Sequence, residues 1–275
     1  MIKKCFSNKS FLISVLLLTP IILIALLGPW IVSQDPLLVD HTIVLRRSMP
    51  GYPLGTDEFG RDILSRLVLG LRPTMIISIG ASLFAMFNGL LFGMIAGYFG
   101  KAPRHIIMRL SDMILCFPSM LLGLLVVVFW GSSVSSLLII IAIIFTPQFI
   151  RLTYASTIKV KQLEFIESDI ALGASPFRII VGGILPNIIS PIIIQFSLTL
   201  SAAILMESSL SFLGVGVLPP TPSWGQMIGT ARGYLHSHPS YLLWPALCLC
   251  VTILAVNLLG DSLRDILDPK LHIME

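Results

Sequence analysis

Long apolar runs separated by short polar segments dominate the 275-residue sequence. The runs occupy residues 11–32, 74–99, 106–130, 134–150, 188–214 and 242–260. A helix needs about 20 apolar residues, with about 17–25 usual, to cross the hydrocarbon core of a bilayer, and these runs meet that requirement. The pattern therefore predicts an all-α membrane protein with six transmembrane helices and both termini on one side of the membrane.

The amino-acid composition agrees with this prediction. Hydrophobic residues make up 55% of the chain and charged residues only 12%, whereas soluble domains are about 25% charged. Such a chain is neither a soluble enzyme nor a disordered tail, and its 4 cysteines form no disulfide framework. The net charge of +4 is spread between the apolar runs, without a basic stripe carrying interleaved aromatic residues. Membrane lipid is therefore an expected partner, and nucleic acid is not.

The first apolar run follows Lys3, Lys4 and Lys9, as the core of a signal peptide would. It is too long for such a core and no small-residue cleavage site follows it, so we expect a retained anchor. Placing the N-terminus in the cytoplasm puts most lysines and arginines inside, which predicts cytoplasmic N- and C-termini. We divide the chain into an N-terminal helix with an extracytoplasmic segment (1–71) and a transmembrane core (72–275).

Small residues recur every fourth position in the second apolar run, at Ala81, Ala85, Gly89, Gly93 and Gly97. Residues four apart lie on one face of a helix, and a stripe of small side chains lets another helix backbone approach closely in lipid. The sequence therefore predicts a helix-packing face here, with a chance arrangement in a glycine-containing run as the alternative.

The segment between the fourth and fifth runs, residues 151–187, is too long and too patterned for a simple turn. Apolar residues recur at helical spacing over 160–172, and Gly173 then supplies a residue that commonly ends a helix. Ser175 and Pro176 are an N-cap and first-position signal for a second helix, which we expect to be interrupted near Pro186. The segment is therefore predicted to be a helix–turn–helix. It is either a docking element that transmits motion or an amphipathic connector on the membrane surface.

Residues 167–187, ESDIALGASPFRIIVGGILPN, resemble the EAA loop of ABC-importer permeases. The matching positions are the acid, the glycine and the closing Leu-Pro: Glu167, Gly173, Leu185 and Pro186. The departures are Ser168 and Asp169 in place of two alanines, and Gly183 in place of Ile. The resemblance implies an ATPase-coupling loop with the following residues: Glu164, Glu167, Ala171, Gly173, Ala174, Ser175, Ile184, Leu185 and Pro186.

Three further stretches resemble segments of the C-type permeases of dipeptide, oligopeptide and nickel importers, and they occur in family order: 54–72, 206–228 and 257–269. The chain is identified as a member of this family, which implies a type I ABC importer permease fold in the bacterial inner membrane. It also implies a half-pore for di- or oligopeptides, with nickel or metal–chelator import as the alternative. The implied partners are a homologous second permease, two cytoplasmic ATPase subunits that hydrolyse ATP, and an extracytoplasmic binding protein.

Charged residues in the 54–72 stretch predict local pairing outside the membrane. Thr56 or Asp57 is placed to cap a short helix, and Asp57–Arg61 and Asp62–Arg66 are acid-first pairs at i,i+4 spacing. Two interpretations are open for this stretch, a solvated helix against the bundle mouth and direct contact with substrate.

Glu207 is the one acidic residue well inside a predicted span. Intramembrane carboxylates are costly and mark transport pathways or buried pairs, so Glu207 is a candidate for the translocation path. The alternatives are a structural hydrogen bond and a position near the outer interface. Arg109 and Asp112 are expected to pair with each other, and His236 and His238 are too weak a pattern to predict a metal site.

Catalytic and nucleotide-binding motifs are absent from the sequence. Gly100–Lys101 lacks the surroundings of a phosphate-binding loop, and neither H-E-x-x-H nor G-x-S-x-G occurs. We therefore expect no enzyme and no cofactor bound by this chain. A secondary transporter is the competing class, but it predicts internal repeats and several charges deep in the membrane. Glu207 is the one such charge well inside a predicted span.

Overall fold

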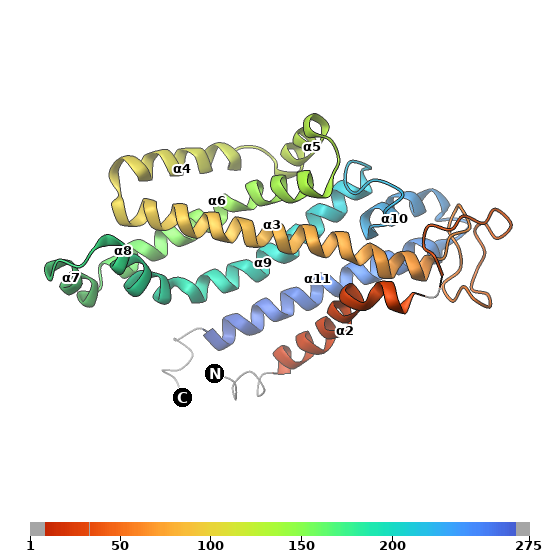
Figure 1. The fold of residues 1–275 in the computed structure, drawn as a ribbon, viewed down its shortest axis with the longest axis horizontal. Helices are drawn as coiled ribbons and strands as arrows, with labels where there is room; N and C mark the ends of the chain where they lie inside the picture. Colours follow the sequence, from red (N-terminus) through yellow and green to blue (C-terminus); the bar gives the residue numbers. More distant parts are fainter. Residues whose placement is uncertain (1–8, 33, 268–275) are drawn as a thin grey trace.

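The computed structural model describes residues 9–32 and 34–267. Within those residues the structure is helical, with isolated two-residue bridges but no strand. Figure 1 shows a long helical bundle. Its elements are α2 (Lys9–Ile31), α3 (Ile63–Phe99), α4 (Lys101–Leu115), α5 (Ser119–Trp130), α6 (Val134–Lys161), α7 (Glu164–Ala171), α8 (Pro176–Arg178), the π-helical turn η1 (Ile179–Ile184), α9 (Leu185–Phe212), α10 (Trp224–Ala231), the 3-10 turn η2 (Arg232–Tyr234) and α11 (Pro239–Leu267).

Five helical segments of the described chain are long and apolar enough to cross a membrane: Lys9–Gly28, Ile63–Phe99, Val134–Lys161, Pro176–Phe212 and Pro239–Leu267. The run 106–130 does not form one unbroken helix, because α4 and α5 meet at an angle of 89°. The break falls at residues 116–118, where Pro118 has no N–H to continue the helical hydrogen bonds. The described residues contain six spans only if this bent pair crosses the membrane as one.

The helix of the second apolar run begins at Ile63, well before the predicted 74, so the expected boundary at residue 71 lies inside α3. Asp62 caps α3 by accepting a hydrogen bond from the Ser65 backbone N–H at 2.9 Å. Arg72 lies within α3, and its Nε donates to the Ala25 carbonyl of α2 at 2.9 Å. Residue 29 is a proline and has no N–H for that carbonyl, so the acceptor is open to the arginine.

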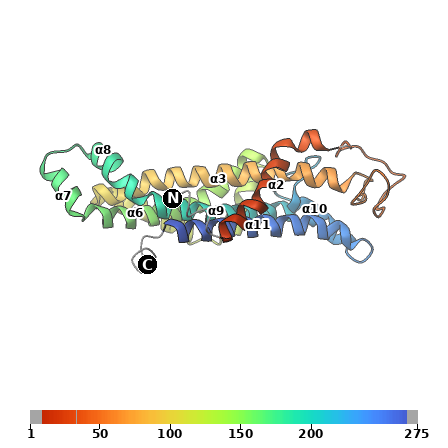
Figure 2. The ribbon, with the colours of Figure 1, turned by 90° about the horizontal axis from the view of Figure 1, so that it is seen from below.

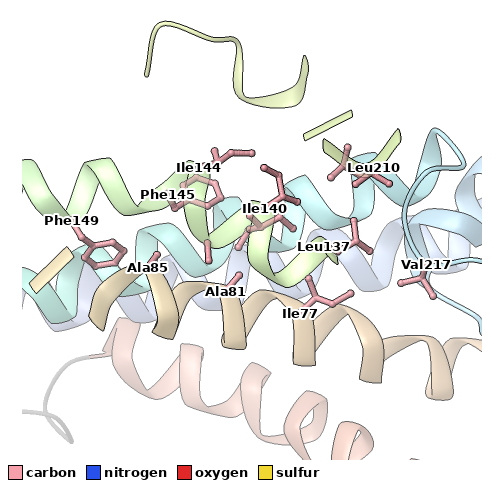
Figure 3. Close-up of a cluster of buried hydrophobic side chains, with 14 of the residues drawn as sticks. Ile77, Ala81, Ala85, Leu137, Ile140, Ile144, Phe145, Phe149, Leu210 and Val217 are labelled. Atoms are coloured by element: carbon pink, nitrogen blue, oxygen red, sulfur yellow. The ribbon is translucent and has the colours of Figure 1, made fainter. Parts of the chain in front are cut away.

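The small-residue stripe of α3 lies against α6. A Cβ built on Gly89 would lie 2.1 Å from Phe149 Cβ, and one on Gly93 would lie 2.5 Å from Thr153 Cβ. A Cβ on Gly97 would likewise meet Thr157 at 2.7 Å. Figure 3 shows the same contact nearer the start of α3, where Ala81 and Ala85 are fully buried among apolar side chains of α6. Close approach of α3 and α6 therefore forms the centre of the bundle.

The two ends of the bundle differ. Residues 34–62 and α10 lie at one end, and α7 and α8 lie at the other (Figures 1 and 2). The beginning of α2 and the end of α11 point toward the α7–α8 end (Figure 1). α2 packs along α11 and α3 at the edge of the bundle and leaves many of its large apolar side chains exposed.

Candidate functional site

The segment between α6 and α9 folds as a hairpin of helices, here called the coupling hairpin (residues 162–186). α7 ends at a residue with positive φ, Gly173 at +78°. The Gly173 N–H donates to the Ile170 carbonyl and the Ala174 N–H donates to the Asp169 carbonyl, both at 3.0 Å. These two bonds are those of a Schellman motif, which satisfies the last carbonyls of a helix. The predicted turn at Gly173 is confirmed.

The second helix of the hairpin begins as predicted. The Ser175 side chain accepts a hydrogen bond from the Arg178 backbone N–H at 3.4 Å, and Pro176 occupies the first helical position. The predicted interruption at Pro186 is wrong, because the helical run continues from Pro176 to Phe212. The wider π-helical turn η1 precedes Pro186, which falls in the first turn of α9. A shift in the hydrogen-bond pattern ahead of the proline keeps the run continuous.

The coupling hairpin has a small core of its own. Ile166 of α7 is fully buried against Ile179 and Ile184, and the cluster continues into Val160 of α6 and Ile188 of α9. The glycine that departs from the family pattern has a place in this core. A Cβ on Gly183 would lie 2.5 Å from Ile166 Cδ1, so the missing side chain leaves room for Ile166.

The outer face of the hairpin exposes apolar side chains. Leu172 is 85% exposed and Phe177 is 76% exposed, on either side of the Gly173 turn. Sequence reasoning missed both residues, although their positions beside the turn were a usable signal. Of the predicted coupling residues, Ile184 is buried, Ala174 and Leu185 are half-buried, and the others are exposed: Glu164, Glu167, Ala171, Gly173, Ser175 and Pro186. The structure brings all nine onto this one hairpin.

At the opposite end, residues 34–62 are held by a buried charge cluster. The fully buried carboxylate of Asp57 accepts from Arg61 Nε at 2.6 Å and lies 3.3 Å from Arg66 Nε. Glu58 accepts from Arg61 Nη2 at 3.0 Å and from the Tyr241 hydroxyl of α11 at 2.6 Å. The cluster thereby ties this segment to the beginnings of α3 and α11.

Two expectations for this segment are wrong and one is confirmed. Asp57–Arg61 is an ion pair as predicted. Arg66 pairs with Asp57 and not with Asp62, because Asp62 turns to cap α3. The expected short helix capped by Thr56 or Asp57 is replaced by turns, since α3 begins only at Ile63.

One carboxyl group in the 34–62 segment has a perturbed pKa. The Thr42 hydroxyl and backbone N–H both donate to Asp40 Oδ1, at 2.6 and 2.9 Å, and these hydrogen bonds hold the pKa of Asp40 below its ordinary value. Asp40 also pairs through its backbone, its N–H donating to the Phe59 carbonyl at 3.1 Å. These bonds fix the fold of the segment locally.

The Glu207 side chain is fully buried within α9 and its neighbours. It accepts hydrogen bonds from Ser211 Oγ at 2.8 Å and Ser208 Oγ at 3.3 Å. Ser211 Oγ in turn accepts from the Val217 N–H at 3.1 Å, which anchors the segment after α9. This arrangement corresponds to the structural hydrogen bond that was the alternative to a place on the translocation path.

The other side chains that the sequence analysis considered, Arg109 with Asp112 and His236 with His238, do not form a site. Asp112 pairs with Arg151 of α6 at 2.5 Å and not with Arg109, because α4 lies against α6. Both partners are more than half exposed. Within residues 9–32 and 34–267, no group of three metal-ligating side chains occurs, and His236 and His238 belong to no such group.

Comparisons with known proteins agree with this architecture. The family described as "Binding-protein-dependent transport system inner membrane component" matches residues 89–273. The di/tripeptide transport system permease protein DppC of Pseudomonas aeruginosa (strain UCBPP-PA14) is 37% identical over 270 residues, covering 96% of this chain and 89% of that protein. The glutathione transport system permease protein GsiD of Pectobacterium atrosepticum is 41% identical over 218 residues, covering 79% of this chain and 72% of that protein.

A solved structure of the MetNI methionine ABC transporter, in an inward-facing conformation, shares the fold. It covers 75% of this chain and 98% of its own with a TM-score of 0.62 at 17% sequence identity. The fold is thus that of a type I ABC importer permease, and the chain is a component working with ATPase and substrate-binding partners, not an enzyme by itself. The chain therefore belongs to the family of inner membrane components of binding-protein-dependent transport systems, as a multi-pass ABC-importer permease.

Proposed function

We propose that this chain forms half of the translocation pore of an ATP-driven importer of short peptides. A homologous second permease forms the other half. Two cytoplasmic ATPase subunits dock on the two coupling hairpins, and an extracytoplasmic binding protein delivers the substrate. The names of the relatives support the substrate class, because they concern dipeptides, di- and tripeptides, and glutathione, which is itself a short peptide.

The observation that carries the ATPase-docking part of this proposal is the exposed apolar face of the coupling hairpin. Leu172 and Phe177 are largely exposed although the hairpin has a core of its own in which apolar side chains are buried. Exposed apolar patches rimmed by polar residues mark interaction sites. The exposed acids Glu164 and Glu167 lie on the same hairpin. An ATPase subunit is the partner that this position and the family support.

The hairpin is also joined directly to two spans. α6 enters it as a helix of 28 residues, about 42 Å long at the usual rise per residue. The run Pro176–Phe212 leaves it without an interruption. When the ATPase subunits close on ATP, they draw the two hairpins together, and α6 and α9 carry that displacement into the membrane. The spans then exchange between inward-open and outward-open packings.

The proposed orientation places the coupling hairpin and both termini in the cytoplasm. It is supported by the beginning of α2 and the end of α11, which point toward the α7–α8 end (Figure 1). The basic residues Lys101, Arg104 and Arg109 occur in α4, directly after α3 approaches this end. An excess of lysine and arginine on the cytoplasmic side is the usual rule for inner membrane proteins.

A substitution at the hairpin turn tests the docking assignment. A Cβ on Gly173 has no neighbour within 4 Å, so Gly173→Asp adds a charge beside Leu172 without a steric clash. Aspartate and asparagine tolerate positive φ better than most residues, which makes Gly173→Asn the matched uncharged control. We expect Gly173→Asp to insert normally, as judged by its abundance in the membrane, and to lose binding-protein-stimulated ATP hydrolysis. Normal uptake by Gly173→Asp at normal abundance would refute the docking assignment.

Uptake measurements test the substrate class and the energy source. A strain lacking this permease and restored with the gene should take up labelled dipeptide in competition with unlabelled peptides, but not with nickel. Competition by nickel and not by peptides would transfer the assignment to metal import. Removal of the ATPase subunits should abolish uptake, and transport driven by an ion gradient alone would contradict the ATP-driven mechanism.

A further inference from the structure

A cavity of about 600 Å³ lies between α6, α9 and α11, beside the roots of the coupling hairpin. Its polar lining comes from Ser156 and Lys159 of α6, Asn187 and Ser190 of α9, and Arg264 of α11. Ile188, Ile194 and Leu267 contribute apolar wall. The cavity therefore combines two cationic side chains and three hydrogen-bonding groups with an apolar surface.

The two cations have no anionic partner in the part of the chain that the structure describes. The ion pairs among these residues involve Arg61, Arg66 and Arg151, and neither Lys159 nor Arg264 takes part in one. Asp261 and Asp265 flank Arg264 on α11 but do not line the cavity. Both cations line one cavity, so an anion held between them reduces their mutual repulsion and stabilises the arrangement.

The position of the cavity indicates the source of the anion. Lys159 lies in the last turn of α6 and Arg264 in the last turn of α11, so both charges stand at the same end of two apolar spans. Lipid headgroups occupy this level of the membrane, and basic pockets between transmembrane helices bind anionic headgroups. The volume is about twenty times the ~30 Å³ share of one water molecule, which exceeds what a free phosphate needs. The apolar wall suits the start of an acyl chain.

We propose that this cavity binds the headgroup of an anionic phospholipid. The phosphate lies between Lys159 and Arg264, with Ser156, Asn187 and Ser190 as hydrogen-bonding groups. The lipid thereby joins α6 and α9, the two helices that enter and leave the coupling hairpin, to α11. The inference rests on the membrane assignment and not on the proposed substrate. The test of lipid binding is therefore independent of the test of peptide import.

Native mass spectrometry of the purified, delipidated importer tests the proposal directly. The probes are phosphatidylglycerol, zwitterionic phosphatidylcholine and inorganic phosphate. We expect one tightly held phosphatidylglycerol per copy of this chain and no comparable phosphatidylcholine. Each lysine or arginine near an anionic headgroup contributes about fivefold in affinity, so Lys159→Gln combined with Arg264→Gln should weaken that binding about 30-fold. Arg109→Gln, which removes an exposed cation outside the cavity, is the matched control and should change nothing.

Several results would overturn the proposal. Equal phosphatidylglycerol binding by the double variant and the wild type would show that the lipid binds elsewhere than in this cavity. Equal binding of phosphatidylcholine and phosphatidylglycerol by the wild type would show that the negative charge of the headgroup is not what the site recognises. Displacement of phosphatidylglycerol by an equal concentration of inorganic phosphate would show a site for free anions and not for lipid.

A second measurement needs no substitution and therefore does not depend on assembly of the double variant. The wild-type importer is reconstituted with phosphatidylglycerol that carries a photoactivatable diazirine near the headgroup. We expect crosslinks in peptides containing 187–194 or 156–163, which unlabelled phosphatidylglycerol suppresses and phosphatidylcholine does not. Crosslinks spread evenly over the apolar surface, without enrichment in these peptides, would contradict a specific site.

Discussion

Replacement of Gly89 by alanine should loosen the contact between α3 and α6. The added Cβ would lie 2.1 Å from Phe149 Cβ and 3.0 Å from the Phe149 carbonyl carbon. The best separation between carbon atoms is about 3.5–4.0 Å. Because two of the three nearest atoms belong to the α6 backbone, a side-chain rotation cannot remove the overlap. The two helices must move apart by about 1 Å or more.

The size of the effect follows from two opposing contributions. Overpacking a well-packed core costs about 1–3 kcal/mol, and contact with backbone favours the upper end of that range. Alanine regains about 1 kcal/mol relative to glycine within a helix. The free energy of unfolding should therefore fall by about 2 kcal/mol. At about 2–4 °C per kcal/mol for a chain of comparable size, Tm should drop by about 4–8 °C.

Thermal unfolding of the purified importer in lipid nanodiscs, followed by intrinsic fluorescence, measures this drop. Gly182→Ala is the matched control, because Gly182 lies in the helical run Pro176–Phe212 and a Cβ there has no neighbour within 4 Å. It should leave Tm unchanged or raise it slightly. If Gly89→Ala melts at the wild-type temperature or above, α3 and α6 do not approach as closely as described.

Two further substitutions test buried polar groups, with Tm as the readout. Ser211→Ala should cost about 1–3 kcal/mol, because Glu207 and the Val217 N–H each lose a hydrogen-bond partner. Ser209→Ala is the control and should be neutral, because the Ser209 hydroxyl bonds only to the Leu205 carbonyl at an exposed position. Equal Tm values for the two variants would contradict the role of Ser211. Asp57→Asn should cost about 3 kcal/mol, because Arg61 and Arg66 are left without their buried counter-charge. Asp112→Asn is the control: it breaks an ion pair that is more than half exposed and should cost about 1 kcal/mol or less. A similar loss of stability in Asp57→Asn and Asp112→Asn would contradict a stabilising role of the buried cluster.

Much of the coupling hairpin could be predicted from the sequence, because its boundaries depend on local chemistry. Gly173 ends α7 because glycine adopts positive φ without steric cost, and Ser175 with Pro176 starts the next helix. The continuation past Pro186 could not be read locally. It depends on a π-helical turn that is packed against Ile166, a residue of the preceding helix.

The pairing of charges was less predictable. Spacing correctly indicated Asp57–Arg61, which are four residues apart. The same rule failed for Arg66, since Asp57 becomes available to it only when residues 34–62 fold back over α3. Asp112 likewise finds Arg151, 39 residues away, because two helices lie side by side. Distance along the chain says little about partners that tertiary packing selects.

The sequence by itself determined that the chain enters a membrane, which segments are apolar enough to span it, and where the helix caps of the coupling hairpin fall. These properties follow from hydropathy and from hydrogen bonds between near neighbours. Only the tertiary structure decided that Asp112 pairs with Arg151, that the Glu207 side chain is fully buried, and that Lys159 of α6 and Arg264 of α11 line one cavity. Each of these depends on which helices pack together, and that choice is made by shape and burial over the whole bundle.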